Sequence, residues 1–255
     1  DVDGNEFIDW IMALGPITIG YGKMYPDEHG VFSHPSPKEA ELAELLRDIF
    51  PCAEMVRFGK NGGDATAGAV RLARAITGRK AVYYCGYHGG WDWFANNILP
   101  NAGTLDQPTH AFTYNDTRSL EQLFDRFGNP ACIIMEVPPE KPSEGYLQKV
   151  IDLAHEHGAL FILDEIVTGF RYAMGGAQER HGIMPDLACF GKGMENGFPI
   201  SAFVCRRVYM EWFDSIPSMD DTFELKTYAE LEKLVNDWRT GDEGGSSSST
   251  SERKD

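Results

Sequence analysis

Several features that would place the chain in a common class are missing from its sequence. No apolar run approaches the ~20 residues that a membrane-spanning helix needs, and no signal peptide is apparent. Basic residues are few: 23 Lys and Arg stand against 39 Asp and Glu, which gives a formal net charge of -16. Such a balance disfavours nucleic acid and anionic membranes as partners. We therefore expect a cytoplasmic protein that binds neither.

Cysteine is also scarce, and its pattern excludes two roles. The chain has 5 cysteines, none of them in a CxxC pair. Their number is odd and most lie in apolar runs, which favours buried thiols in a reducing compartment over disulfides or a metal site. The positions concerned are Cys52, Cys85, Cys132, Cys189 and Cys205. We expect no metal.

Nucleotide-binding signatures are lacking as well. The glycine-rich stretch Phe58–Thr66 has neither the GxGxxG spacing of dinucleotide-binding folds nor the Gly-Lys-Ser/Thr of a P-loop. A nicotinamide-dependent oxidoreductase on a doubly wound sheet is therefore disfavoured.

The domain organisation can be predicted from composition. With 255 residues and 42% hydrophobic residues, the chain can bury the core of one large α/β domain or two small ones. The Gly- and Ser-rich ending is low in complexity and cannot order itself by burying apolar surface. The first residue is Asp1 rather than Met, which suggests a fragment. We expect an N-terminal segment at 1–36, a large domain at 37–223, a short helical extension at 224–240 and a disordered tail at 241–255.

Short apolar runs alternate with helical patterns along the large domain. The seven runs that are typical of buried strands are Met55–Gly59, Ala81–Cys85, His110–Tyr114, Ala131–Glu136, Leu160–Asp164, Leu187–Phe190 and Ser201–Cys205. Helical spacing occurs at 38–50, 64–77, 117–127 and 145–157. This alternation predicts an α/β fold with a mainly parallel seven-stranded sheet and helices on both faces.

Polar residues follow several of these strands, where open α/β sheets bind their ligands. They are Asn61, Tyr87, Glu136, Asp164 and Lys192. A carboxylate at the position of Asp164 is partly desolvated and needs a cationic or hydrogen-bonding partner, although a helix-capping Asp fits the same pattern. Lys192 lies among glycines that let a bulky ligand approach, and a pocketed lysine can attack aldehydes. A surface lysine in a loop is the alternative.

Two further segments suit ligand binding. Gly62 and Gly63 precede a predicted helix, where backbone N–H groups and the helix dipole favour a phosphate. Tyr87 offers a flat face for stacking on a heteroaromatic ring, unless it is an ordinary core aromatic. His88 can serve as a base, a ligand or a turn residue, and we favour a supporting role.

In this order, these motifs resemble the fold-type-I pyridoxal-phosphate (PLP) enzymes, and among them the class III aminotransferases and glutamate-1-semialdehyde 2,1-aminomutase. The resemblance runs from Asp1 to about Phe223 and is strongest in Asp164–Arg171, Gly191-Lys192 and Asn61–Arg74. It implies that 37–223 is a PLP-binding large domain. Subfamilies that act on amino sugars or spore-coat polysaccharides are the most similar.

The resemblance also implies chemical roles. Lys192 is the residue that forms a Schiff base with PLP, and Asp164 pairs with the protonated pyridine nitrogen so that the ring stays an electron sink. His88 is counted with the residues that surround the cofactor. The implied activity is transfer of an amino group from an amine donor to a carbonyl acceptor, or within one molecule in a mutase. A homodimer with sites at its interface is implied too.

The remaining implied roles concern cofactor contacts. Ile166 packs against one face of the PLP ring and Tyr87 covers the other. Gly62 and Gly63 hold the phosphate through backbone N–H groups. Thr222 resembles the family threonine that reaches the phosphate of the neighbouring subunit's cofactor.

The sequence departs from the family pattern in two places. Gly63 stands where relatives usually have Ser or Thr, so a hydroxyl contact to the phosphate is lost. After the Thr-Phe segment, the family continues with glycines and a C-terminal domain, which Glu224–Trp238 and the Ser-rich tail replace here. The chain is thus expected to be truncated at its C-terminus.

Two alternatives to amino-group transfer stay open. The same core supports other PLP chemistry, such as racemisation or decarboxylation. A truncated, catalytically silent homologue that binds only PLP or a partner subunit also fits the sequence.

Overall fold

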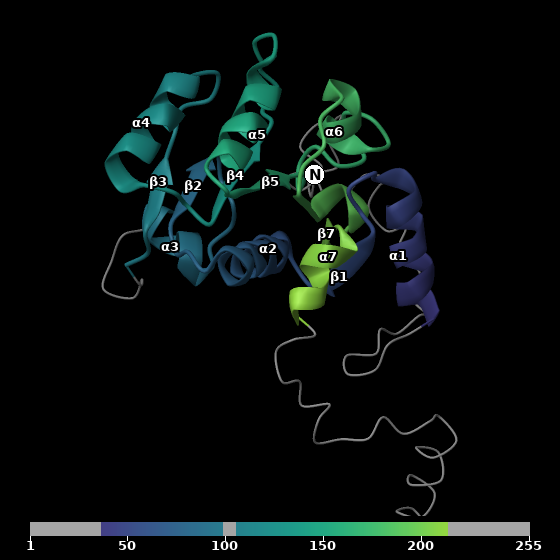
Figure 1. Cartoon of the computed structure of the whole chain (residues 1–255). Coiled ribbons are helices and arrows are strands. Elements are labelled where there is room, and N and C mark those ends of the chain that lie inside the picture. Colours follow the sequence, from purple (N-terminus) through teal and green to yellow (C-terminus); the bar gives the residue numbers. More distant parts are fainter. Residues whose placement is uncertain (1–36, 99–105, 214–255) are drawn as a thin grey trace, which may run out of the picture. The chain divides into compact units, whose positions relative to one another are not determined.

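Seven strands form one mixed sheet in the computed structural model of the chain, which describes residues 37–98 and 106–213 (Figure 1). The predicted N-terminal segment, helical extension and tail lie outside the described residues, as does Thr222. In their spatial order the strands are β1 (Met55–Gly59), β7 (Ser201–Cys205), β6 (Leu187–Phe190), β5 (Leu160–Asp164), β4 (Cys132–Glu136), β2 (Val82–Cys85) and β3 (Thr109–Ala111).

The sheet is mainly parallel, as predicted. Strands β3, β2, β4, β5 and β6 pair in parallel, whereas β7 pairs antiparallel with both β6 and β1. Strand β1 therefore runs in the same direction as the parallel strands, and β7 alone among the described strands is reversed. The carboxyl ends of the other six strands meet at one edge.

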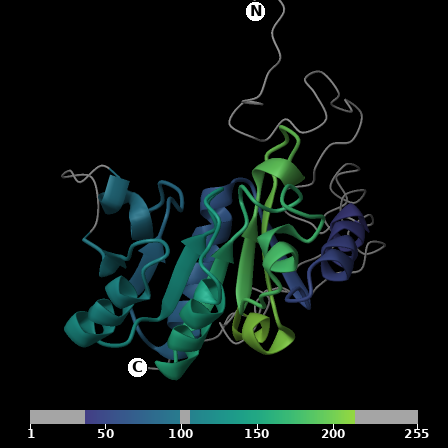
Figure 2. The ribbon, with the colours of Figure 1, turned by 90° about the horizontal axis from the view of Figure 1, so that it is seen from above.

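Helices cover both faces of this sheet (Figures 1 and 2). Four of them match the predicted helical segments within two residues at each end: α1 (Pro37–Ile49), α2 (Gly62–Thr77), α4 (Thr117–Phe127) and α5 (Tyr146–Glu156). The sequence analysis did not predict the shorter α3 (Asp92–Ile98), α6 (Gly176–His181) and α7 (Arg207–Met210), nor the 3-10 turns η1 (Lys192–Met194) and η2 (Glu211–Phe213).

Residues along the central strands alternate between the two faces. In β5, Phe161 and Leu163 belong to the core that includes residues of α4 and α5, whereas Leu160 and Ile162 belong to the core that includes residues of α2. A strand buried on both faces is apolar throughout, which is why these runs could be recognised from the sequence. Each fully buried side chain of this kind contributes ~1.5–3 kcal/mol to the free energy of unfolding.

A third core forms where α1 packs on β6 and β7. Phe50, directly after α1, lies with its ring centroid 4.2 Å from that of Phe190 in β6, and Leu46 is completely buried beside them. All five cysteines are free and buried in these cores, as predicted.

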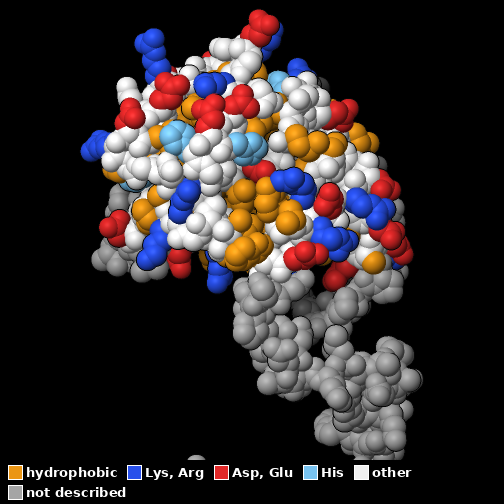
Figure 3. All heavy atoms as spheres, viewed as in Figure 1, with side chains coloured by type: hydrophobic (Ala, Val, Ile, Leu, Met, Phe, Trp, Pro, Cys, Tyr) orange, Lys and Arg blue, Asp and Glu red, His pale blue; other side chains and the backbone are white. Residues whose placement is uncertain are grey.

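The face drawn in Figure 3 carries charged side chains of both signs around hydrophobic side chains that gather near α7. Val208 and Trp212, in and after α7, are among the exposed hydrophobic residues. No helix in the described part of the chain is long and apolar enough to cross a membrane.

Candidate active site

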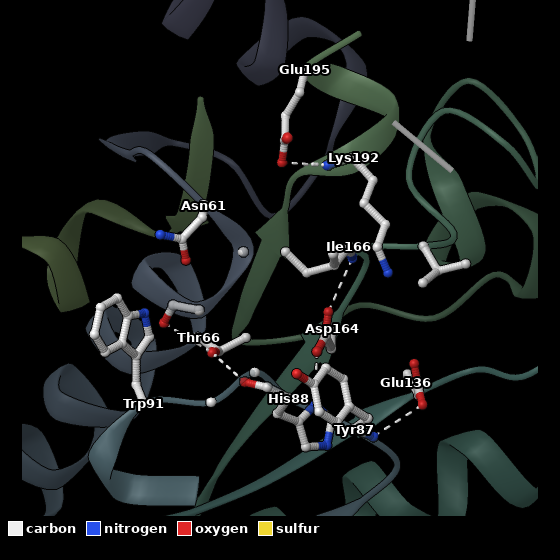
Figure 4. A pocket seen from close by; sticks show the side chains of 15 residues that line it. Asn61, Thr66, Tyr87, His88, Trp91, Glu136, Asp164, Ile166, Lys192 and Glu195 are labelled. Atoms are coloured by element: carbon white, nitrogen blue, oxygen red, sulfur yellow. Dashed lines mark hydrogen bonds and ion pairs between the residues drawn. The ribbon is translucent and has the colours of Figure 1, made fainter. Parts of the chain in front are cut away.

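A cavity of about 400 Å³ opens at the edge where the carboxyl ends of the strands meet (Figure 4). This volume lies within the ~300–1,000 Å³ that is typical of small-molecule sites. Segments that follow β1, β2, β4, β5 and β6 supply the lining. The lining residues are Asn61, Gly62, Gly63, Thr66, Tyr87, His88, Gly89, Gly90, Trp91, Glu136, Asp164, Ile166, Val167, Lys192 and Glu195. Polar residues from five different strand ends are thus brought to one place.

Asp164, the last residue of β5, forms the floor of this cavity. Its side chain is 3% exposed, and its Oδ1 accepts a hydrogen bond from the Ile166 N–H over 3.0 Å. Its Oδ2 lies 2.7 Å from Nδ1 of His88. The bond to Ile166 caps a turn and not a helix, since no helix begins directly after Asp164, so the helix-capping alternative is wrong. The same carboxylate faces the cavity. Hydrogen bonds on both oxygens hold a buried carboxylate in one orientation.

His88 is fully enclosed behind Asp164. Because a carboxylate only accepts hydrogen bonds, the contact with Asp164 places a proton on Nδ1 of His88. The His88 ring stacks on Trp93 with centroids 6.1 Å apart, and its Nε2 is buried with no hydrogen-bond partner in the described part of the chain. The His88 ring thus lies where it can orient the Asp164 carboxylate, and its supporting role stays a prediction.

The N-terminus of α2 forms another wall of the cavity. Asn61 caps this helix: its side chain accepts the Asp64 N–H over 3.2 Å, and Asp64 Oδ2 accepts the Asn61 N–H over 3.0 Å. The helix therefore begins at Gly62, two residues earlier than predicted, because the capping box extends it over both glycines. The N–H groups of Gly62 and Gly63 belong to the first turn, which has no intrahelical acceptor for them.

Glycines keep the space in front of this helix open. A Cβ atom at Gly62 would lie 2.8 Å from Cδ1 of Ile166, and one at Gly191 would lie 3.2 Å from the same atom. Ile166 is thus wedged between two glycines and presents its side chain to the cavity. A side chain on either glycine would displace it.

Lys192 follows β6 and begins the turn η1. Its backbone has φ +40°, a conformation that costs a non-glycine residue on the order of 1–3 kcal/mol. The Lys192 N–H donates to Oε1 of Glu195 over 2.6 Å, which holds this turn. The Lys192 side chain points into the cavity on the side of Ile166 and Asp164 (Figure 4). Lys192 is therefore a cavity residue rather than the surface-loop lysine of the alternative interpretation.

Glu195 adds a second carboxylate to the wall near Lys192. Burial raises the pKa of Glu195 above its ordinary value, while the Lys192 N–H and the Lys192 charge lower it. The sequence analysis did not single out Glu195, because its approach to Lys192 depends on the tight turn that η1 makes.

Tyr87 lies at the mouth of the cavity rather than in the core. It is 59% exposed, so the alternative of an ordinary core aromatic is wrong. Its N–H donates to Glu136 Oε1 over 3.1 Å, which ties the segment after β2 to the end of β4. Gly86, with φ +108°, permits this contact because a Cβ there would lie 2.5 Å from Cγ of Glu136.

A buried network fixes the segment that follows Asp164. Glu165 is completely buried and accepts hydrogen bonds from the N–H groups of Ala177 and Gln178, at 2.9 and 3.0 Å, and from the Thr168 hydroxyl. Burial raises the pKa of Glu165, and these hydrogen bonds counteract part of that effect. The network anchors the turn that carries Ile166 and Val167 into the cavity wall.

Seven of the eight residues predicted for the site lie together in this cavity. They are Gly62, Gly63, Tyr87, His88, Asp164, Ile166 and Lys192. Thr222 lies outside the described residues. The lining residues that the sequence analysis missed include Thr66, Trp91, Val167 and Glu195. A glycine-rich loop, as around Trp91, has no periodicity from which its path could be predicted.

The mainly parallel seven-stranded sheet with helices on both faces has the fold of the fold-type-I PLP-dependent transferases, and Lys192, Asp164 and the N-terminus of α2 meet at one edge of it. Residues 129–225 of the chain match the family described as Aminotransferase class-III.

Curated relatives agree with this family. A 3-aminobutyryl-CoA aminotransferase of Cloacimonas acidaminovorans is 36% identical over 240 residues, which covers 88% of this chain and 58% of that protein. A glutamate-1-semialdehyde 2,1-aminomutase of Methanosphaera stadtmanae is 39% identical over 242 residues, which covers 84% of this chain and 56% of the relative. The chain thus spans little more than half the length of these relatives.

Solved structures share the fold. The FumI protein of Sphingopyxis sp. MTA144, in its PLP internal aldimine form, superposes with a TM-score of 0.74 at 29% identity, over 86% of this chain and 57% of that one. An omega-transaminase from Sphaerobacter thermophilus gives a TM-score of 0.64 at 29% identity, over 72% of this chain and 48% of the other.

Proposed function

We propose that the chain carries the PLP-binding core of an enzyme that moves an amino group between an amine or amino acid and a carbonyl compound, as an aminotransferase or an aminomutase. The observation that carries this proposal is the meeting of Lys192, Asp164 and the N-terminus of α2 around one cavity. The family relationship supports it. The amine donor and the carbonyl acceptor are small molecules, which suits the size of the cavity.

The residues of the cavity fit PLP part by part. The N–H groups of Gly62 and Gly63 suit its phosphate, because a helix N-terminus attracts anions. The Asp164 carboxylate, already held by two hydrogen bonds, suits the ring nitrogen. Ile166 and Tyr87 offer apolar and aromatic surface for the two faces of the ring, and the Lys192 amine suits the aldehyde.

PLP supplies an electron sink that weakens bonds at the carbon bearing the amino group. The chain contributes position, charge and a proton carrier. Asp164 would supply a negative charge to the ring nitrogen, and the contact with His88 would hold that carboxylate in its orientation. The Nζ atom of Lys192 would be the base within the cavity that moves a proton.

We also propose two properties of the whole protein. Two copies of the chain form a homodimer with sites at its interface, as the relationship to the class-III aminotransferases implies. The protein works in the cytoplasm, because five free buried thiols suit a reducing compartment.

Absorbance spectroscopy tests the proposed function. Purified protein mixed with PLP should acquire a visible band that differs from free PLP and that changes when a suitable amine is added from a panel. Product analysis with a carbonyl acceptor should then detect the transferred amino group. A stable band without transfer would instead support a catalytically silent homologue, and racemised or decarboxylated products would support other PLP chemistry. Failure to bind PLP at all would refute the proposal.

A further inference from the structure

We propose that Trp91 is a phosphate-binding residue of this site, and that its indole N–H takes the place of a side-chain hydroxyl at position 63. This inference rests on the proposed function, because the phosphate concerned is that of PLP. It concerns a residue that the sequence motifs did not single out.

The first observation is where the indole lies. A Cβ atom at Gly63 would be 2.4 Å from Cδ1 and 2.5 Å from Nε1 of Trp91. The polar edge of the indole thus occupies the space that a side chain at position 63 would fill, next to the first turn of α2 (Figure 4). Glycine at position 63 is what makes room for it.

The second observation is that the backbone holds Trp91 in this place. The Trp91 carbonyl accepts the N–H groups of Phe94 and Ala95, both at 2.8 Å, and so anchors the residue to the start of α3. Gly89, with φ +96°, lets the preceding loop lie close to α2, since a Cβ there would be 3.0 Å from Cα of Gly63. The Thr66 hydroxyl bonds the His88 carbonyl at 2.8 Å and fastens the same loop to α2.

The chemistry of the indole selects an anion. Indole Nε1–H donates a hydrogen bond and cannot accept one. It lies beside a helix N-terminus, whose N–H groups and dipole already favour negative charge. Trp91 is 47% exposed and is one of the residues that line the cavity.

The nearby carboxylates accept backbone N–H groups and not the indole N–H. Asp64 Oδ2 accepts the N–H groups of Lys60 and Asn61, both at 3.0 Å. Glu195 Oε1 accepts the Lys192 N–H. Each acidic group therefore already has backbone donors, while the indole faces the cavity.

Trp91→Phe tests the proposal, because it keeps an aromatic ring and removes the N–H. We expect the dissociation constant for PLP to rise roughly tenfold to a hundredfold, as befits a hydrogen bond to a charged group. The dissociation constant for pyridoxal, which lacks the phosphate, should not change. Binding is measured by titration and absorbance, independently of turnover. The matched control is Trp212→Phe. Trp212 is not among the residues that line the cavity, so this variant should bind both compounds with wild-type affinity.

A swap between positions 63 and 91 provides a second test. Gly63→Ser alone should weaken PLP binding, because its Cβ would collide with the indole. In a Trp91→Ala background the same Gly63→Ser change should strengthen PLP binding, because the new hydroxyl replaces the lost donor. The role of Trp91 would be overturned if Trp91→Phe lost affinity for PLP and pyridoxal equally, or if its PLP affinity did not change. It would also be overturned if the double variant gained no affinity. None of these results would affect the proposed function. A wild-type protein that binds no PLP would overturn both.

Discussion

The Lys192→Ala protein is expected to lose the visible absorbance band that PLP produces with the wild-type chain, together with all amino-group transfer. Lys192 is the only lysine among the residues that line the cavity in the described part of the chain. Removing its amine removes both the covalent attachment of the aldehyde and the base that moves the proton. The phosphate and ring contacts remain, so PLP should still bind, but reversibly and with lower affinity.

Absorbance spectra and dialysis of the PLP complex measure this effect. Lys149→Ala is the matched control, because Lys149 is exposed on α5, away from the cavity, and alanine suits a helix. If Lys192→Ala retained an adduct that borohydride could reduce onto the protein, another amine would be the attachment point and the assignment would be wrong.

The Asp164→Asn protein is expected to bind PLP but to turn over on the order of 10²–10³-fold more slowly. Removing one preorganised electrostatic contact at a reacting centre typically has an effect of this size. Asparagine carries no charge to pair with the ring nitrogen. In the wild-type chain, one carboxylate oxygen contacts the Ile166 N–H and the other contacts Nδ1 of His88. Asparagine has only one side-chain oxygen, so one of these two contacts loses its acceptor.

Single-turnover rates and PLP affinity separate these effects, since we expect the rate to fall far more than the affinity. Asp125→Asn, an exposed site on α4, serves as the control for the change of charge. A near-normal rate in Asp164→Asn would show that the carboxylate does not act on the ring.

The positions of the strands along the chain were largely predictable because burial leaves a local signal. Strands such as β4 and β5 are covered on both faces, and their residues are apolar up to the last one, Glu136 or Asp164. Strand β7 is equally buried, and its reversed direction is set by pairing with β1 and β6, which leaves no mark in the run itself. The sheet order and the direction of β7 therefore required the structure.

The candidate site was predictable where a residue lies at or just beyond the carboxyl end of a strand, as Asp164 and Lys192 do. Contacts made across the fold were not. The His88–Asp164 pair joins residues 76 positions apart, and the sequence indicates only that each needs some partner. Trp91 reaches α2 through a loop whose path depends on Gly89 at positive φ. Helix α2 begins two residues earlier than predicted because Asn61 and Asp64 form a capping box, which the periodicity of apolar residues does not indicate.

Peptide mapping of the borohydride-reduced complex tests the central claim most directly. Wild-type protein loaded with PLP, reduced, digested and analysed by mass spectrometry should carry the cofactor on the peptide that contains Lys192. Prior addition of an amine donor should release the label from the chain, because the donor replaces the Lys192 amine. A label on a different lysine, a label spread over several exposed lysines, or a label that no amine can displace would contradict the account.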